Sequence, residues 1–332
     1  MRKCWIVAAA VALGGCQTAP VRSAGNSGDV LARLATALPG EYDNHEQAAR
    51  ANAGVAVPHL RETWKALGDD LWIWKLQILG APAAAEAAWL YRVAAVDGRI
   101  KLTPYRALDP AIGKTALDEK AHFKFEAAQW AELAPCAQTG QWKNTQFSAA
   151  ADAGACSALL SGLGESAGLL PLRLTLDGDM LHSVTFADQA RVADAGIDAR
   201  RLRWFGGWTA LNGGGPKAQS DNQDWHVQKD LHLSSEGGRM PLRWRDGAAS
   251  GWSLELARSS YPERKLNVLQ LNVIDDASGR VLDYVWANPE TNAIGFNLGW
   301  LQVGLRFGAL FNDWARLFNC RVDPVPHAMN AP

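Results

Sequence analysis

The residues best suited to chemistry in this chain lie close together near its start. The segment GEYDNHEQ at residues 40–47 places the carboxyl groups of Asp43 and Glu46 beside the amides of Asn44 and Gln47. A carboxyl group can donate or accept a proton, and an amide can hold a polar ligand in one orientation. We therefore take Asp43 and Glu46 as candidate catalytic groups and Asn44 and Gln47 as candidate ligand contacts. The alternative is the polar start of a helix that faces solvent.

Two aromatic–guanidinium pairs, Tyr91-Arg92 and Tyr105-Arg106, are the second group of candidate ligand contacts. An arginine can hold a carboxylate through two parallel hydrogen bonds, and a tyrosine offers a flat ring and a hydroxyl. Neighbouring residues of a strand point to opposite faces, so only one member of each pair can line an enclosed interior. The other member is then expected on the outer wall.

The segments around these residues are typical of a mainly β protein. Residues 29–38 have leucines at helical spacing, and residues 40–54 indicate a second short helical stretch. Short strand-like runs follow, bounded by Gly, Pro or Asp-Gly turns and without β-α-β alternation, which predicts a closed antiparallel barrel or a sandwich. The expected strands are residues 71–78, 88–93, 99–102, 172–176, 180–186, 202–205, 227–234, 240–245, 252–257, 266–274, 281–287 and 300–307.

The start of the chain has the pattern of a bacterial lipoprotein signal peptide over residues 1–15. A basic Arg-Lys pair precedes an apolar run at residues 5–13, which is too short to span a bilayer and ends Leu-Gly-Gly-Cys16. We expect cleavage before Cys16 and lipid on its thiol, with residues 16–28 as a tether. Because Gln17 is not aspartate, the expected place is the periplasmic side of the outer membrane. The alternative is an ordinary secretory peptide.

The remaining cysteines are expected to meet an oxidising compartment. Cys136 and Cys156 enclose about 20 residues, and closing such a loop stabilises a fold by roughly 3 kcal/mol in a chain-entropy estimate. We favour a disulfide between them, and the alternative joins one of them to Cys320. The cysteines and histidines have no spacing typical of a metal site, so no metal is expected.

The composition of the chain limits which partners and which division into domains are expected. With 33 Lys and Arg against 34 Asp and Glu, the chain has a net charge of -1 and no basic field, so no nucleic-acid partner is expected. Fifteen Trp indicate a deep apolar interior or a ligand lining. The glycine-rich residues 206–217 are the clearest internal boundary. We therefore expect a barrel domain at 29–216 and a β-rich extension at 217–332.

The order of several segments resembles that of the CpcT/CpeT-type bilin lyase family. The most specific element is the spacing of Gly40, Asn44 and Gln47, and the resemblance covers roughly residues 28–216. The segments that carry it are GEYDNHEQAARA at 40–51, WLYRVAA at 89–95, LTPYRALDP at 102–110, the two cysteines around QWKNTQF, and MLHSVTFADQARVADAGIDARRLRWFGGW at 180–208.

This resemblance implies a calycin-like antiparallel barrel, often dimeric, whose mouth holds an open-chain tetrapyrrole, or bilin. Such lyases join the bilin to a cysteine of an acceptor protein through a thioether. On this resemblance Arg92 or Arg106 pairs with a propionate, and Asp43 or Glu46 is the acid that polarises the reacting double bond. We expect a lyase or a tetrapyrrole-binding relative. The alternatives are a non-enzymatic, lipocalin-like lipoprotein with an apolar ligand, and an assembly factor that docks partners through residues 217–332.

Overall fold

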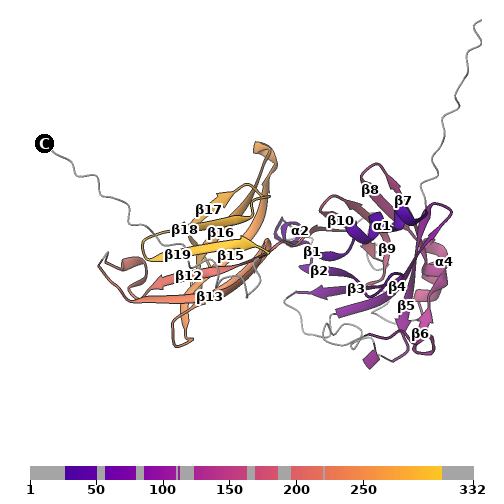
Figure 1. The fold of residues 1–332 in the computed structure, drawn as a ribbon, viewed down its shortest axis with the longest axis horizontal. Coiled ribbons are helices and arrows are strands. Elements are labelled where there is room, and N and C mark those ends of the chain that lie inside the picture. The colour runs from indigo at the N-terminus through magenta and orange to yellow at the C-terminus, as the bar shows by residue number, and fades with distance from the viewer. Residues whose placement is uncertain are drawn as a thin grey trace, which may run out of the picture.

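The computed structural model describes residues 27–50, 57–79, 86–109, 111–112, 123–162, 169–185, 196–219 and 221–308. These residues form two β-rich units that meet beside helix α2 (Figure 1). The expected lipidation site Cys16 and the third cysteine, Cys320, lie outside the described residues. Within them, no helix combines the length and apolar character needed to cross a membrane.

The N-terminal unit is a closed antiparallel β-barrel. Ten of the described strands follow the order β4-β3-β2-β1-β11-β10-β9-β8-β7-β5, pairing of β4 with β5 closes the ring, and β6 adds to β5. The predicted fold class, a mainly β chain with a calycin-like barrel, is confirmed. The strands are β1 (Gly40–Asp43), β2 (Leu60–Ala66), β3 (Leu71–Ile78), β4 (Glu86–Val96), β5 (Arg99–Ala107), β6 (Trp130–Glu132), β7 (Gln138–Lys143), β8 (Gln146–Ala150), β9 (Pro171–Asp177), β10 (Met180–Thr185) and β11 (Ile197–Arg201).

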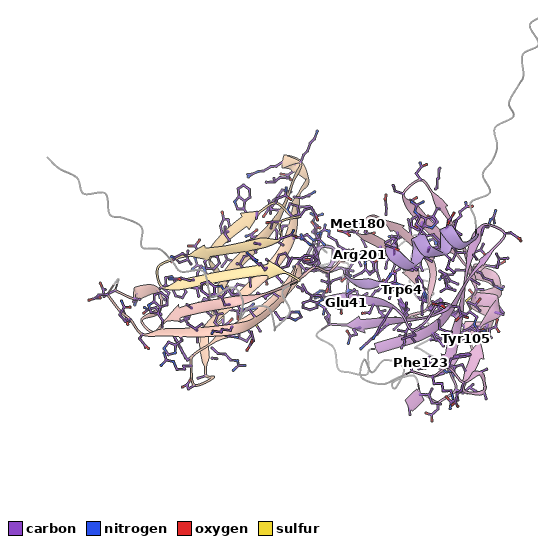
Figure 2. The ribbon with its side chains drawn as sticks, viewed as in Figure 1. Glu41, Trp64, Tyr105, Phe123, Met180 and Arg201 are labelled. Atoms are coloured by element: carbon purple, nitrogen blue, oxygen red, sulfur yellow. A yellow bond between two sulfur atoms is a disulfide. The ribbon has the colours of Figure 1, made fainter. Side chains whose placement is uncertain are left out.

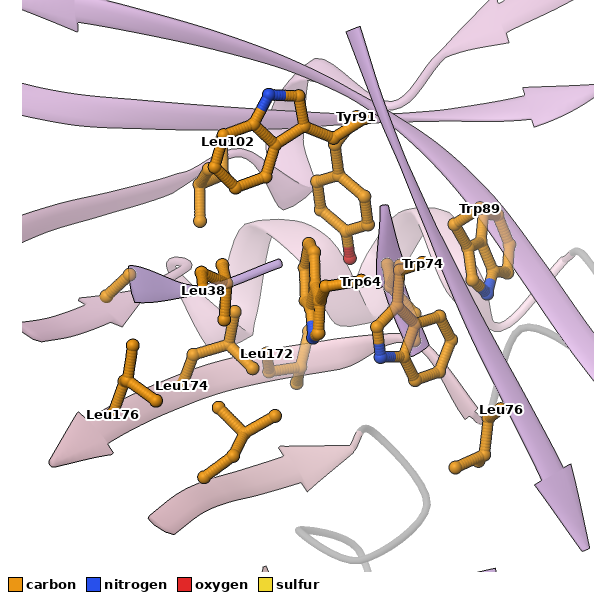
Figure 3. Packing of buried hydrophobic residues seen from close by; sticks show 14 of the residues in the cluster. Leu38, Trp64, Trp74, Leu76, Trp89, Tyr91, Leu102, Leu172, Leu174 and Leu176 are labelled. Carbon is orange, nitrogen blue, oxygen red and sulfur yellow. The ribbon is translucent and has the colours of Figure 1, made fainter. Parts of the chain in front are cut away.

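Large apolar side chains fill the barrel, because alternate residues of each strand point inward. Trp64, Trp74 and Tyr91 are fully buried in one cluster with leucines from the facing strands (Figure 3). Leu34 of helix α1 (Ser27–Ala37) is buried in the same cluster, so the helix packs onto the barrel core. Four tryptophans, Trp64, Trp72, Trp74 and Trp89, are therefore accounted for by this interior.

A disulfide joins Cys136 and Cys156, which confirms the pairing favoured from the sequence. It links the short helix η2 (Ala134–Cys136) to helix α4 (Ala153–Leu160), and both cysteines are buried in the barrel core. The described residues of the barrel unit also form the short helices α2 (His45–Arg50) and η1 (Ala127–Gln129).

The described residues of the C-terminal unit form a sandwich of two four-stranded antiparallel sheets, ordered β13-β12-β19-β18 and β14-β15-β16-β17. Side chains of both sheets, such as Phe205 and Leu271, share one buried cluster, so the sheets pack face to face. The elements are β12 (Trp204–Asn212), η4 (Gly215–Lys217), β13 (Trp225–Ser234), β14 (Glu236–Arg243), β15 (Ala249–Tyr261), η5 (Pro262–Arg264), β16 (Leu266–Asp275), β17 (Val281–Ala287), β18 (Ala293–Asn297) and β19 (Leu301–Phe307).

The border between the two units lies earlier than the expected position after residue 216. Strand β12 pairs with β13 and β19, so it belongs to the sandwich, and the last barrel strand ends at Arg201. The glycines that suggested a boundary have another role. A Cβ on Gly207 would lie 2.1 Å from the carbonyl oxygen of Gly304, so this glycine lets β12 approach β19 closely.

Candidate binding site at the junction

The segment expected to be helical from residue 40 begins instead as strand β1, which pairs with β2 and β11. Helix α2 then starts at His45, just after Asn44. Tyr42 of β1 is buried in the barrel core. Because neighbouring strand residues point to opposite faces, Asp43 points out of the barrel, toward the sandwich.

Asp43 is the centre of a buried polar cluster. Its side chain is 0% exposed, and its Oδ1 lies 2.6 Å from His59 Nε2 and accepts from the His45 backbone N at 2.9 Å. Its Oδ2 accepts from Arg61 Nη2 at 3.1 Å. These three donors hold the carboxylate of Asp43 in one orientation at the end of β1. At the neighbouring His45, burial lowers the pKa of the imidazole, and the nearby His59 lowers it further.

Asn44 and Gln47 tie α2 to the barrel. Asn44 Oδ1 accepts from the Leu60 backbone N at 2.7 Å, and its Nδ2 donates to Gln47 Oε1 at 3.2 Å. Gln47 Nε2 donates to the carbonyl of Gly196 at 2.9 Å, and its Oε1 accepts from the Asp198 backbone N at 3.2 Å. The spacing of these two amides thus has a structural reason, which is to anchor α2 between β2 and β11.

Glu46 joins the barrel to the sandwich. Its carboxylate pairs with Arg50 and Arg200, and its Oε1 accepts from the Ser260 backbone N at 3.0 Å. Burial raises the pKa of Glu46, but Arg200 and the hydrogen bond from Ser260 outweigh that effect and bring the pKa below its usual value. Glu46 is therefore ionised at neutral pH and acts as an anion, not as a proton donor.

Glu236 is a carboxyl group at this site that the sequence did not reveal. It is 1% exposed and lies between two guanidinium groups, with Arg258 Nε at 2.5 Å and Arg200 Nη1 at 3.3 Å. Burial raises its pKa to about 7, although Arg258 and Arg200 act in the opposite direction. Gly237 and Gly238 directly after it interrupt the strand pattern, so the sequence predicts a strand only from residue 240, whereas β14 begins at Glu236.

An open cavity of about 650 Å³ brings these groups together between the two units. Its lining includes Asp43, Glu46, Gln47, Arg50, Arg200 and Glu236. Met180, which Figure 2 labels at the junction, lines it too. The volume lies within the range of ~300–1,000 Å³ that is usual for small-molecule sites. Three of the four candidates from residues 43–47 therefore line one cavity. The fourth, Asn44, does not line it but donates a hydrogen bond to Gln47.

The two tyrosine–arginine pairs do not line this cavity. Tyr91 points into the barrel interior, where burial raises its pKa well above 10, and its hydroxyl has no hydrogen-bond partner among the described residues (Figure 3). Arg92 lies on the outer wall, 3.2 Å from Asp70 and 5.8 Å from the Tyr105 ring. This division of the first pair agrees with strand alternation.

Tyr105 and Arg106 also point to opposite faces, but in this pair the tyrosine lies outside the barrel core. Tyr105 packs in a separate cluster with Leu90 and Trp130, and burial, followed by the nearby Glu132, raises its pKa. Arg106 is half-buried and shares the strand face of Leu102, which is in the barrel core. Arg106 is therefore the arginine of the two pairs that shares the inward face.

No protein-family model matches the chain, and comparison with curated proteins gives no match. Among the described residues, no group of three or more His, Cys, Asp or Glu could hold a metal ion.

The fold and the site together define a two-unit β protein, a barrel joined to a sandwich, with a charged cavity where the two meet.

Proposed function

We propose that the protein binds an open-chain tetrapyrrole in the junction cavity, as a relative of the CpcT/CpeT-type bilin lyases. The observation that carries this proposal is the shared lining of one cavity of about 650 Å³. Asp43, Glu46 and Gln47, from the segment of the resemblance, line it together with the guanidinium groups of Arg50 and Arg200.

The cavity offers partners for each part of such a ligand. Pyrrole N–H groups are donors, and the carboxylate of Glu46, whose side chain is 19% exposed, is an acceptor, while buried Asp43 holds the wall behind it. The Arg50 side chain is 51% exposed at the cavity rim, where its guanidinium can hold a propionate. Met180 supplies a polarisable apolar contact for the rings. The ligand would therefore lie beside the barrel and against the sandwich, rather than inside the barrel.

A lyase reaction at this site needs a proton and needs no oxidant. The acceptor thiol adds across the exocyclic double bond, so that a C–S bond forms at the exocyclic carbon and a proton reaches the adjacent ring carbon. Glu236 has a pKa of about 7 and borders the cavity, but its side chain is 0% exposed, so it would supply that proton only after Arg200 moves aside. Ionised Glu46 would orient the ligand, and orientation supplies much of the rate.

The alternative function is that of a lipocalin-like carrier, which would hold an apolar ligand inside the barrel. The barrel interior supports this function less well than the junction cavity supports tetrapyrrole binding. Trp64, Trp74 and Tyr91 occupy the centre of the described barrel core, each at most 1% exposed. A ligand of that kind would have to displace these side chains. The junction cavity is available without such a change, and its lining is charged.

Tetrapyrrole binding can be tested by absorbance. The purified mature protein is titrated with biliverdin and with phycocyanobilin, and we expect a saturable spectral shift at micromolar concentrations. No shift at tens of micromolar would contradict the proposal. A denaturing gel after incubation with an apo-phycobiliprotein then separates a lyase, which leaves the acceptor coloured, from a carrier, which does not.

The proposed location is the periplasmic face of the outer membrane, through lipid on Cys16. Substitution Cys16→Ser should move the protein from the membrane fraction to the soluble periplasmic fraction. If the variant remains in the membrane fraction, the lipid anchor is not what holds the protein there.

A further inference from the structure

The outer face of one sandwich sheet carries a groove of about 390 Å³, separate from the junction cavity. Three aromatic rings line it, and each is strongly exposed: Tyr261 at 44%, Tyr284 at 57% and Trp286 at 58%. They come from strands β15 and β17, on either side of β16 (Figure 1). Exposed rings gathered in one groove indicate a contact surface.

The register of the sheet fixes these rings on a rigid base. Trp286 lies opposite Gln270 and Tyr284 lies opposite Asn272 on β16. Between these two positions, Leu271 points to the other face, into the sandwich core. Residues two apart on a strand are about 7 Å apart, which is comparable to the size of one sugar ring. The two rings of β17 are therefore spaced to meet adjacent rings of a chain-like ligand.

A row of polar side chains crosses the same face. Gln270 Nε2 donates to Asn272 Oδ1 at 2.8 Å, Asn272 Nδ2 donates to Glu255 Oε1 at 3.3 Å, and Tyr261 donates its hydroxyl to Gln270 Oε1 at 3.4 Å. The Gln270 amide is thus held in one orientation, with capacity for further hydrogen bonds. An apolar protein surface would cover this amide without pairing it, at a cost in free energy.

Sugars fit this combination of groups. A pyranose presents C–H groups on its face, which the negative face of an aromatic ring attracts, and hydroxyls at its edge, which suit an amide. Arg264 also lines the groove, and a guanidinium complements a carboxylate. We propose that this groove binds an acidic polysaccharide, with sugar rings on Tyr284 and Trp286, hydroxyls at Gln270 and a carboxylate at Arg264.

The test is a titration of the full mature protein, followed by tryptophan fluorescence and by calorimetry. The probes are a galacturonate hexasaccharide and neutral cellohexaose. Trp286→Ala should lower the affinity for the galacturonate by about tenfold or more, as expected for a central aromatic contact. Leu282→Ala is the matched control, because Leu282 lies on the same strand, is 48% exposed and does not line the groove. It should bind as the wild type does.

Arg264→Ala separates the acidic sugar from the neutral one. It should weaken galacturonate binding and leave any binding of cellohexaose unchanged. No response to either sugar at millimolar concentration, or equal affinity in Trp286→Ala and wild type, would overturn the proposal. Equal wild-type affinity for both sugars would overturn the assignment of an acidic ligand. If Trp286→Ala instead dissociates a dimer in light scattering, the groove is a protein contact and the proposal is wrong.

Discussion

Arg200 of barrel strand β11 and Glu236 of sandwich strand β14 meet across the junction, with Arg200 Nη1 3.3 Å from Glu236 Oε2. Arg200 also pairs with Glu46, and Glu236 also accepts from Arg258. Opposite charges therefore alternate from helix α2 to strand β15. Because Glu46, Arg200 and Glu236 line the junction cavity, this chain of charges sets its shape.

Removing Arg258 should destabilise the protein strongly. Arg258 is 5% exposed, and its loss leaves Glu236 buried with one cationic partner fewer. We expect Arg258→Ala to lower the free energy of unfolding by roughly 3 kcal/mol, measured by denaturant titration. Arg239→Ala is the control, because Arg239 pairs with Asp276 at the surface, and it should cost less than about 1 kcal/mol. Similar effects of the two substitutions would contradict the buried network.

Glu236 should make the stability of the protein fall as pH rises. Its folded-state pKa of about 7 lies above the usual 4.5, so the folded protein holds the proton more tightly than the unfolded chain does. The resulting stabilisation is complete below pH 4.5 and is lost as pH rises through 7, and amounts to roughly 3 kcal/mol. The lowered pKa of Glu46 acts in the opposite direction, because its contribution is lost as pH falls.

The variant Glu236→Gln isolates this effect, since it keeps the shape and removes the titration. Free energies of unfolding should be measured for both proteins at pH 5 and at pH 8. We expect the wild type to lose stability relative to Glu236→Gln between the two pH values. Parallel changes in the two proteins would show that Glu236 has an ordinary pKa in the folded state.

Asn44 should matter for stability more than its polar character suggests. Its side chain is 1% exposed and satisfies the buried backbone N of Leu60. Asn44→Ala leaves that N–H without its partner, so we expect a loss of about 2 kcal/mol in a denaturant titration. The exposed Asn267 provides the comparison, and Asn267→Ala should change stability by less than about 0.5 kcal/mol. If Asn44→Ala lowers the free energy of unfolding by as little as Asn267→Ala does, Asn44 does not have the anchoring role inferred for it.

Strands could be predicted where alternation is strong and turns are explicit, whereas β2, β6, β7, β8, β11 and β18 have no counterpart among the expected strands. The expected strands at 71–78 and 281–287 coincide with β3 and β17. Strand β1 was missed because four residues with a polar end resemble the start of a helix, and only pairing with β2 and β11 makes them a strand. That pairing is long-range and leaves no local pattern.

The site was predicted only in part, because some of its residues are brought together by long-range contacts that leave no local sequence pattern. Asp43, Glu46 and Gln47 are neighbours in sequence, so their shared cavity could be anticipated. Arg200 and Glu236 reach the same cavity from strands far along the chain, and only the docking of the two units brings them there. Strand alternation predicted that one member of each tyrosine–arginine pair faces inward, but it did not say that Tyr91 would be that member or whether the interior is open or filled.

The disulfide should contribute to stability through the unfolded chain. It joins residues 20 apart, and a loop of that size corresponds to about 3 kcal/mol. The double variant Cys136→Ser with Cys156→Ser should be less stable by this order, and a reducing agent should lower the stability of the wild type and leave the variant unchanged. Sensitivity of the double variant to the reductant would point to another bond.

The location of the tetrapyrrole is tested most directly by filling the junction cavity without touching its charges. Met180 is 39% exposed and lines the cavity, so Met180→Trp should block it. Val227, 55% exposed on β13, provides the control substitution Val227→Trp. In a biliverdin titration followed by absorbance, we expect Met180→Trp to lose at least about tenfold in affinity and Val227→Trp to match the wild type. Unchanged affinity in Met180→Trp, with a loss in Arg106→Ala instead, would place the ligand in the barrel mouth and contradict the junction site.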